Sequence, residues 1–438
     1  MTVPSADAAT GALRVAAVAD ADSFVKWAAA LITSVPSAGV RLALVETPLT
    51  VSPDQQRAAL AGSGFPGHAV TRMRFAGLQR WLRADPPDVL VVAGRGPFAR
   101  LVMRIVDTVH PRPVTVMGLP GMAIPAQRGA AQYRREADLL VVHSRREQRA
   151  FGELSDRLGL GMRLGLATLP YARTTARPRG GTDLVFAAQA LVPRDLAERR
   201  RMAEILRDAA LADPDRRVVV KLRSRRERGE EETHLERAAY PDLLGAVPDN
   251  LVVSHEPMSA ALSHAQGLVT VSSTAAVEAM AQGVPVIAVD TFGVRKTHLN
   301  TVFADSGVLG DAADVVARRF RHPTPEWRDD NYFHDEAEAT WWAQVEELVE
   351  RRRRGDLPAR TVPAPRGGAL HAAWHRKSVL GAHDRSVSGT VALAVGTPVV
   401  RSFLWARRRR GRHGAGTWTD DASDITLAPA PFQDSIRR

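Results

Sequence analysis

Short apolar runs alternate with amphipathic stretches along the first half of the chain. Five runs rich in Val, Leu and Ala predict strands: Leu13–Ala19, Val40–Glu46, Val89–Ala93, Val114–Gly118 and Leu139–His143. Helical periodicity fills much of the space between them, at Phe24–Thr33, Phe75–Arg83, Phe98–Val109 and Arg145–Leu158. This alternation is typical of a doubly wound α/β domain with a parallel sheet.

The second half repeats the pattern after a linker-like stretch, 173–182, which contains Pro178, Gly180 and Gly181. Its predicted strands are Leu184–Ala188, Arg217–Leu222, Leu251–Val253, Leu268–Val271 and Pro285–Val289, with a long helix at Arg194–Ala212. A chain of 438 residues also exceeds the roughly 250–300 residues that one core supports. We therefore predict two Rossmann-like domains, 12–180 and 181–354, after a disordered start at 1–11.

Polar residues follow two of the predicted strands in the second half. Ser272, Ser273 and Thr274 come after Leu268–Val271 and open a helix, where free backbone amides and hydroxyls suit a phosphate. His255-Glu256-Pro257 follows the preceding strand. Parallel sheets bind ligands at the carboxyl ends of their strands, so we expect both groups to lie side by side.

The polar residues at these strand ends resemble the motifs of a known enzyme class. Ser272-Ser273-Thr274, the helix with Glu278, and Gly283-Val284-Pro285 resemble the nucleotide-binding half of GT-B glycosyltransferases. His255-x-Pro257 with Ser272-Ser273 is similar to the HP and SS motifs of bacterial sialyltransferases and polysialyltransferases, although Glu256 separates His from Pro. The resemblance, over residues 12–350, implies two domains facing a cleft, a CMP-sialic-acid-like donor, and ribose binding by Glu278. It also implies that the helix ending near Arg354 packs back on the first domain.

Two cations end another predicted strand of the second half. Lys221 and Arg223 would reach the same edge and could neutralise the phosphate of a departing nucleotide. The alternative is a solvated basic loop, because Arg225, Arg226 and Arg228 follow. His255 could donate a hydrogen bond to the donor, or merely cap a strand end, and Pro257 is expected to start the next helix.

Acidic residues follow the first strand directly. Asp20 or Asp22 could act as general base on an acceptor hydroxyl. Two alternatives stay open: Asp22 or Ser23 caps the next helix, or Asp20 is the nucleophile of a haloacid-dehalogenase-type phosphatase, whose motif this stretch resembles. We expect the acceptor side to comprise Ser23, Lys26, Gly94, Arg95 and Gly121, the glycines allowing close substrate approach.

The charge is unevenly distributed. The net charge is +11, yet residues 1–350 contain 42 basic and 42 acidic residues, whereas 351–438 contain 17 Lys and Arg against 6 Asp and Glu. An apolar but interrupted run, Val391–Trp405, lies between arginine clusters. We predict a largely irregular basic tail, 355–438, in which 388–412 lies on an anionic membrane surface. Plain disorder is the alternative, and nucleic-acid binding is the least favoured.

Absent motifs narrow the function. The chain has no cysteine, which fits a reducing cytoplasm, and it lacks a Walker lysine loop, a Gly-x-Gly-x-x-Gly turn after the first strand and a His-Glu-x-x-His site. We therefore predict a cytoplasmic glycosyltransferase that needs neither metal nor cofactor and that can attach to the inner face of the cell membrane. Its partners would be a nucleotide sugar and a capsular, envelope or lipid-linked glycan. The alternatives are a UDP-sugar epimerase of the same architecture and a non-catalytic nucleic-acid-binding or envelope-binding protein.

Overall fold

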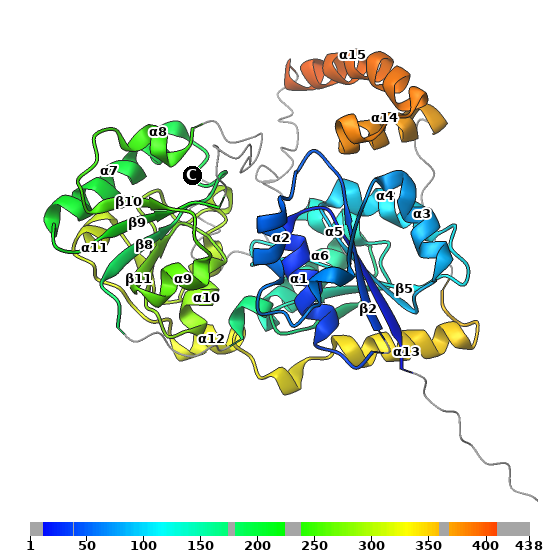
Figure 1. Ribbon diagram of the computed structural model, residues 1–438, viewed down its shortest axis with the longest axis horizontal. Coiled ribbons are helices and arrows are strands. Elements are labelled where there is room, and N and C mark those ends of the chain that lie inside the picture. Colours follow the sequence, from blue (N-terminus) through cyan, green and yellow to red (C-terminus); the bar gives the residue numbers. More distant parts are fainter. Residues whose placement is uncertain (1–11, 38, 174–179, 224–237, 359–367, 410–438) are drawn as a thin grey trace, which may run out of the picture.

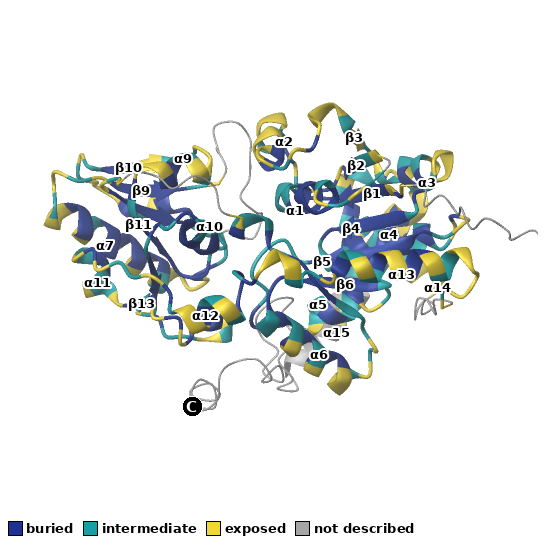
Figure 2. Cartoon of the chain, turned by 90° about the horizontal axis from the view of Figure 1, so that it is seen from below, coloured by how far each residue is buried: buried dark blue, intermediate teal, exposed yellow. Residues whose placement is uncertain are grey.

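The protein consists of two parallel sheets covered by helices, with a helical hairpin added at the end. The computed structural model describes residues 12–37, 39–173, 180–223, 238–358 and 368–409. The first sheet and its helices lie on the right of Figure 1, and the second sheet lies on the left. Figure 2 shows both sheets as buried layers between helices whose outer faces are exposed. The predicted α/β class with two Rossmann-like domains is confirmed.

The first sheet has seven parallel strands in the order β3-β2-β1-β4-β5-β6-β7. The strands are β1 Arg14–Ala19, β2 Gly39–Val45, β3 Val70–Met73, β4 Val89–Ala93, β5 Val114–Gly118, β6 Leu139–Val142 and β7 Leu164–Leu166. The helices are α1 Asp22–Thr33, α2 Pro53–Leu60, α3 Phe75–Ala84, α4 Gly96–Val106, α5 Arg128–Arg134 and α6 Arg145–Leu158. Strands β4, β5 and β6 are buried throughout, which explains their continuous apolar sequences.

The second sheet has six strands, in the order β10-β9-β8-β11-β12-β13, and they are also parallel. The strands are β8 Asp183–Ala187, β9 Val218–Lys221, β10 Leu251–Ser254, β11 Ala265–Thr270, β12 Val286–Val289 and β13 Leu309–Gly310. The helices are α7 Leu196–Ala212, α8 Tyr240–Leu244, α9 Met258–Ser263, α10 Ala275–Ala281, α11 Ala312–Val316 and α12 Pro325–Asp330.

The predicted strands all occur, and three further strands were missed. Strands β4 and β5 have the predicted bounds, but β3, β7 and β13 were not predicted. Each missed strand is two to four residues long, and β3 reads Val-Thr-Arg-Met with no buried residue. Such short edge strands carry no apolar run for a sequence pattern to detect.

Helix α13, Trp341–Arg353, joins the first domain although it follows the second in sequence. Trp341, Val345 and Leu348 pack in the same hydrophobic cluster as the buried residues of β1 and α1. The chain therefore crosses back between the domains after α12, as the family resemblance implies. In Figure 1 this helix lies beneath the first sheet.

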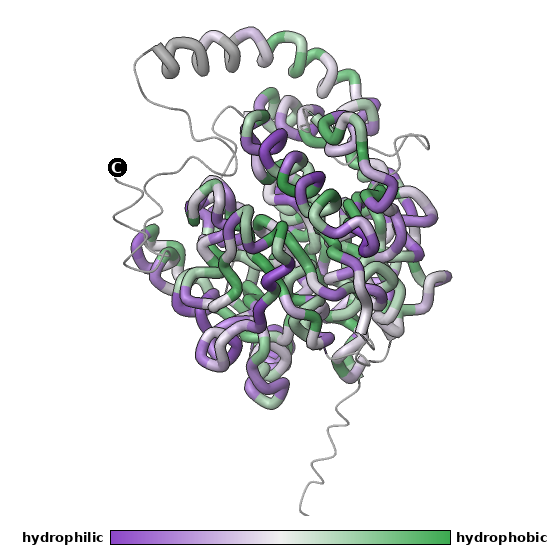
Figure 3. Tube along the Cα trace, turned by 90° about the vertical axis from the view of Figure 1, so that its left-hand side faces the viewer, coloured by the Kyte–Doolittle hydropathy of each residue, from purple (hydrophilic) through white to green (hydrophobic). Residues whose placement is uncertain are grey.

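The predicted irregular tail contains two helices. Helices α14, Gly368–Leu380, and α15, Val387–Arg409, form a hairpin, and α14 contacts α4 (Figure 1). Figure 3 shows α15 at the periphery of the molecule, where it contacts α14. Residues 1–11 and 410–412, for which disorder and membrane contact were predicted, lie outside the described residues. None of the helices within the described ranges has both the length and the apolar character that a membrane span requires.

Candidate active site at the edges of the two sheets

The carboxyl edges of the two sheets meet between the domains. In each sheet the strand order reverses once, between β1 and β4 in the first and between β8 and β11 in the second. Ligands of doubly wound folds bind at such reversals, outside the carboxyl ends of the strands. The first reversal carries Asp20 and Gly94, and the second carries Gln189 and Ser272. Contacts between residues that follow these strands join the two edges directly.

Ser272 lies at the second reversal, held by a glutamine that the sequence analysis missed. The Ser272 amide donates to Gln189 Oε1 at 3.0 Å, and Gln189 Nε2 donates to Ser272 Oγ at 3.3 Å. Ser272 is 7% exposed. Gln189 follows β8, and only the parallel pairing of β8 with β11 brings it here. The predicted free amide of Ser272 is therefore engaged within the protein.

Ser273 and Thr274 precede α10, as predicted, and their hydroxyls also have protein partners. The Ser273 amide donates to Thr270 Oγ1 at 3.0 Å, and Ser273 Oγ accepts from the Ala275 amide at 3.2 Å. Thr274 Oγ1 accepts from the Met122 amide of the first domain at 3.4 Å. An accepting hydroxyl can still donate its own hydrogen. The hydroxyls of Ser273 and Thr274 therefore keep a hydrogen for a phosphate, whereas Ser272 Oγ donates to Gln189 Oε1 at 3.4 Å and would have to exchange that partner.

His255 is at the predicted edge but is not beside Ser272, so the expected adjacency is wrong. Strands β9 and β8 lie between β10 and β11. Three strand spacings of about 4.8 Å separate the two groups by about 14 Å. His255 is half-buried, Glu256 is exposed, and Pro257 is the N-cap residue of α9. These three residues follow β10, the outermost strand of the second sheet. A nucleotide bound at Ser272 would have to extend along the sheet to reach them.

Lys221 and Arg223 end β9, between His255 and Gln189 in the sheet. Lys221 is 8% exposed, and its ammonium group donates to the Leu222 carbonyl. Arg223 is exposed and makes a bidentate pair with Asp22 of the first domain, with Nε at 2.9 Å from Oδ2. The two predicted cations thus differ in exposure, and Arg223 reaches across the domain interface.

Asp20 is fully buried at the end of β1. Arg95 Nε lies 3.0 Å from Asp20 Oδ2, and the Arg95 amide donates to Oδ1 at 3.3 Å. Burial raises the pKa of Asp20, while the charges of Arg95 and Arg134 oppose that rise. A carboxyl with a raised pKa suits proton abstraction, but here Arg95 stands over it. Asp20 can reach an acceptor only if Arg95 moves.

Helix α1 presents its first two turns to the second domain. Its N-cap residue is Ala21 with no side-chain cap bond, so the capping alternative for Asp22 and Ser23 is not observed. Ser23 is half-buried in the first turn. Lys26 Nζ lies 3.7 Å from Glu278 Oε2 of α10 and 4.2 Å from the centre of the Tyr171 ring. Predicted donor-side and acceptor-side residues are thus in direct contact.

Two glycines leave room for close approach at this edge. A Cβ on Gly94 would lie 2.4 Å from the Phe98 ring and 3.2 Å from Asp20 Oδ1. A Cβ on Gly121 would lie 2.5 Å from Thr274 Oγ1, across the domain interface. Gly121 thus allows the first-domain loop to approach the start of α10. In this structure the space that it leaves is used by the protein itself.

The loop after β12 is a second feature that the sequence analysis missed. It places Arg295 and His298 at the carboxyl end of the strand next to β11. His298 Nε2 is 2.9 Å from Glu198 Oε2 at the start of α7, and the buried Asn300 bonds both the Arg295 amide and the Gly293 carbonyl. The sequence signal for this loop is the polar run that follows Asp290 at the carboxyl end of β12.

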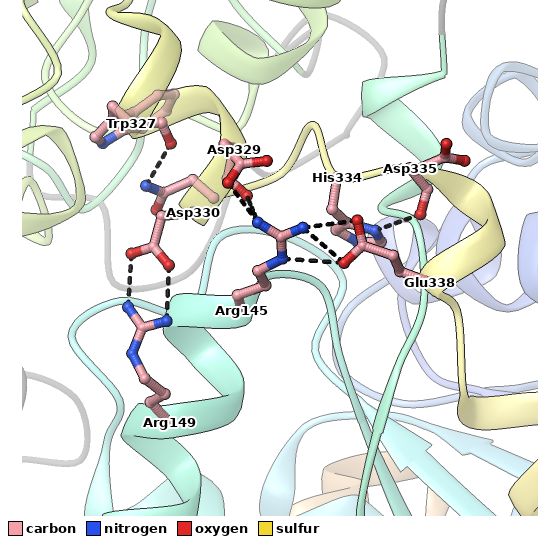
Figure 4. Close-up of polar contacts among 9 residues, drawn as sticks. Arg145, Arg149, Trp327, Asp329, Asp330, His334, Asp335 and Glu338 are labelled. Atoms are coloured by element: carbon pink, nitrogen blue, oxygen red, sulfur yellow. Dashed lines mark hydrogen bonds and ion pairs between the residues drawn. The ribbon is translucent and has the colours of Figure 1, made fainter.

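A buried glutamate connects the loop that carries Gly121 to the crossover segment. Glu147 accepts bonds from the amides of Ala123 and His143 and from the Tyr332 hydroxyl, all at 2.8 Å. Burial raises the pKa of Glu147, and the same burial raises that of Tyr332. Neighbouring arginines of α6 extend this connection, because Arg145 pairs with Asp329 and Glu338, as shown in Figure 4.

His143, at the end of β6, has a structural role. Trp27 Nε1 donates to His143 Nε2 at 2.7 Å, and His143 Nδ1 is 2.9 Å from the Ala167 carbonyl. Since Nε2 accepts, Nδ1 carries the hydrogen and the ring is neutral. Burial lowers the pKa of His143 to about 4.

A separate cavity of about 160 Å³ lies at the connections between the domains. Leu31, Thr168, Arg173, Glu336 and Trp342 are among its lining residues. Its lining includes none of the predicted donor-side or acceptor-side residues, so it is distinct from the edges described above.

Two domains with parallel sheets of seven and six strands, which meet at their carboxyl edges and are followed by a helix (α13) that returns to the first domain, define the GT-B class of protein. The chain belongs to the family described as "Putative glycosyltransferase (DUF6716)", whose model matches residues 15–348. It is therefore a member of a glycosyltransferase family. The phosphatase alternative has no support in this match.

Solved structures share the architecture at low sequence identity. A protein described as a "putative UDP-N-acetylglucosamine 2-epimerase" from Listeria monocytogenes is 11% identical, with a TM-score of 0.50 over 81% of this chain and 100% of its own. The pneumococcal O-GlcNAc transferase GtfA is 9% identical, with a TM-score of 0.48 over 78% and 99%. No curated protein matched the sequence. The similarity to the Listeria structure shows the fold and leaves the substrates open.

Proposed function

We propose that this protein transfers a sugar from a nucleotide-sugar donor, bound at the edge of the second sheet, to an acceptor bound at the edge of the first. One observation carries the proposal: Arg223 contacts Asp22 and Glu278 contacts Lys26 across the domain interface. A donor and an acceptor bound at these edges would therefore meet. Binding requires these contacts to separate, so we expect the domains to open first.

The second domain supplies the groups for the donor. The hydroxyls of Ser272, Ser273 and Thr274 would bind phosphate oxygens, and Glu278 would accept hydrogen bonds from the ribose. Negative charge grows on the leaving phosphate, and a guanidinium can meet it with two parallel hydrogen bonds. We assign this task to the exposed Arg223, which pairs with Asp22 across the interface, with the buried Lys221 as the second cation. In this scheme side-chain cations, and no metal, neutralise the leaving group.

The first domain supplies the base. When a donor phosphate takes Arg223 away from Asp22, the Asp22 carboxylate becomes available to an acceptor hydroxyl at the same place. Asp22 would then act as a base only when the donor is bound. Asp20 is the second candidate, since its pKa is raised but Arg95 covers it.

The donor and acceptor are proposed as classes. Two donor classes are proposed. The motif resemblance favours a CMP-linked acidic sugar. The description of the Listeria protein, which has the same fold, favours a UDP-linked sugar. For the acceptor we propose a capsular or envelope glycan, or its lipid-linked precursor, at the cytoplasmic face of the membrane.

Thermal-shift measurements on the full chain test the proposal. CMP, UDP, GDP and their sugars are added at increasing concentration, and a site ligand at 100 times its Kd adds about 2.7 kcal/mol of stability. Ser272→Ala with Ser273→Ala should abolish that gain, whereas Ser263→Ala, an exposed hydroxyl on α9, should not. If no nucleotide stabilises the protein, the donor proposal fails.

An epimerase is the second candidate, because the Listeria protein of the same fold is described as one. The two reactions differ in their need for an acceptor. NMR spectra of each stabilising sugar nucleotide, incubated with the protein alone, would show a new epimer if this candidate is right. No conversion without an acceptor is the result that sugar transfer predicts.

A further inference from the structure

Helix α15 carries an apolar stripe on its outer face. Val387 is 79% exposed, Val391 52% and Val395 55%. Residues four apart lie on one side of a helix, so these valines form a continuous line. Ala394 and Pro398 are exposed as well. Within the described ranges no other helix exposes three large apolar side chains at this spacing.

The opposite face of α15 already has its partner. Ala392 is fully buried, and a Cβ on Gly396 would lie 2.6 Å from Trp374 of α14. Helix α14 in turn contacts α4 of the first domain. The valine stripe is therefore not the face by which α15 packs on the protein. Figure 3 shows hydrophobic positions on this outlying helix.

Charge indicates what the stripe contacts. Residues 351–438 contain 17 Lys and Arg against 6 Asp and Glu, and the sequence of α15 ends in Arg407–Arg409. Arg385, two residues before α15, is exposed. A second copy would place one strongly basic tail against another, which is unfavourable. An anionic lipid surface offers both an apolar layer and negative charge.

We propose that α15 lies on an anionic lipid surface, with Val387, Val391 and Val395 inserted at the boundary between headgroups and acyl chains. This docking does not depend on the proposed function. The hairpin also indicates which edge faces the membrane, because a Cβ on Gly381 would lie 2.9 Å from Pro48 Cγ and His383 Nδ1 lies 3.7 Å from Glu46 Oε2.

Glu46 and Pro48 follow β2, at the same carboxyl edge as Asp20. A lipid surface under α15 would thus adjoin the acceptor side of the protein. We infer that the acceptor is linked to a lipid, and this second step does rest on the proposed sugar transfer.

The test is sedimentation of the full chain with vesicles of phosphatidylcholine alone or with added phosphatidylglycerol, without any nucleotide. We expect binding only to the anionic vesicles. The variant with Val387→Ser, Val391→Ser and Val395→Ser should bind at least about ten-fold more weakly, because three apolar side chains lose their insertion energy. The control, Leu211→Ser with Val247→Ser, changes exposed apolar residues of the second domain and should bind normally.

Two outcomes would overturn the docking proposal. In one, the valine variant binds anionic vesicles as well as the unchanged protein does. In the other, vesicles are not bound and the variant instead alters a concentration-dependent oligomer, which would identify a second copy as the partner. A cooperative thermal unfolding transition of the valine variant, at the Tm of the unchanged protein and without nucleotide, shows that it is folded. Because vesicle binding and nucleotide binding are measured separately, failure of one proposal is distinguishable from failure of the other.

Discussion

Lys26 of α1 and Glu278 of α10 lie 3.7 Å apart across the domain interface, and the Lys26 ammonium also rests over the Tyr171 ring. If Glu278 binds ribose, Lys26 competes with the donor for the same carboxylate. A partly exposed ion pair is worth up to about 1 kcal/mol. Lys26→Met should therefore raise the affinity for a nucleotide by up to about five-fold, measured by isothermal titration calorimetry.

Glu278→Gln should act in the opposite direction. It loses a charge-assisted hydrogen bond to the ribose, worth about 1.5–3 kcal/mol, and affinity should fall by about ten-fold or more. A gain in nucleotide affinity for Lys26→Met together with a loss for Glu278→Gln would show that Lys26 and the donor compete for Glu278. Equal losses in both would show instead that the pair itself is needed for binding.

The close contact between Gly121 and Thr274 predicts that Gly121→Ala destabilises the protein and that Thr274→Ala compensates for this loss. Gly121→Ala places a methyl group 2.5 Å from Thr274 Oγ1, which forces the domains apart at this point. Overpacking of this kind costs about 1–3 kcal/mol. Adding Thr274→Ala removes the clashing oxygen, so the double variant should recover most of the lost Tm. Simple additivity of the two changes in Tm would contradict the contact.

His143 should make stability fall as the pH falls. Its folded pKa of about 4 lies below the ordinary value of 6.5, so the unfolded chain binds the proton more readily between these values. Its contribution is present above pH 6.5 and is lost as the pH falls toward 4, amounting to about 3 kcal/mol in full. The Tm of His143→Gln should depend less on pH across this window than that of the unchanged protein.

His375 in α14 should also make the protein less stable as the pH falls, because burial lowers the pKa of His375 to about 4 as well. The His375→Gln variant therefore has to be measured beside His143→Gln. His322→Gln, at an exposed histidine, is the matched control. An unchanged pH dependence of the Tm in both variants would contradict neutral rings at the buried His143 and the half-buried His375.

Arg145 should stabilise the crossover segment more than an ordinary surface arginine does. It pairs with both Asp329 and Glu338, as Figure 4 shows. Among the described residues, the ion pair of Arg157 is with Glu153, one turn away on its own helix. Arg145→Ala should lower the Tm more than Arg157→Ala, and about 1 M salt should reduce the difference by screening. Equal shifts would show that the segment is held by other contacts.

Local patterns predicted most of the fold. The apolar runs of β4 and β5 were predicted at their observed bounds because strands buried on both faces read as continuous apolar sequence. The position of Ser272–Thr274 at a strand end, just before a helix, could also be predicted, since it depends on neighbouring residues alone. The tail helices were not predicted, because the sequence of α15 contains Gly396 and Pro398.

By itself, the sequence thus determined the α/β alternation, the two domains and the edge at which polar residues gather, since each follows from periodicity over a few residues. Only the tertiary structure decided the neighbours: strand order inserted β8 and β9 between His255 and Ser272 and brought Gln189 to the serine. Domain packing then placed Arg223 against Asp22. Such contacts depend on how segments that are distant in the sequence pack against one another. Packing of this kind is determined by many residues along the chain, so no single motif predicts it.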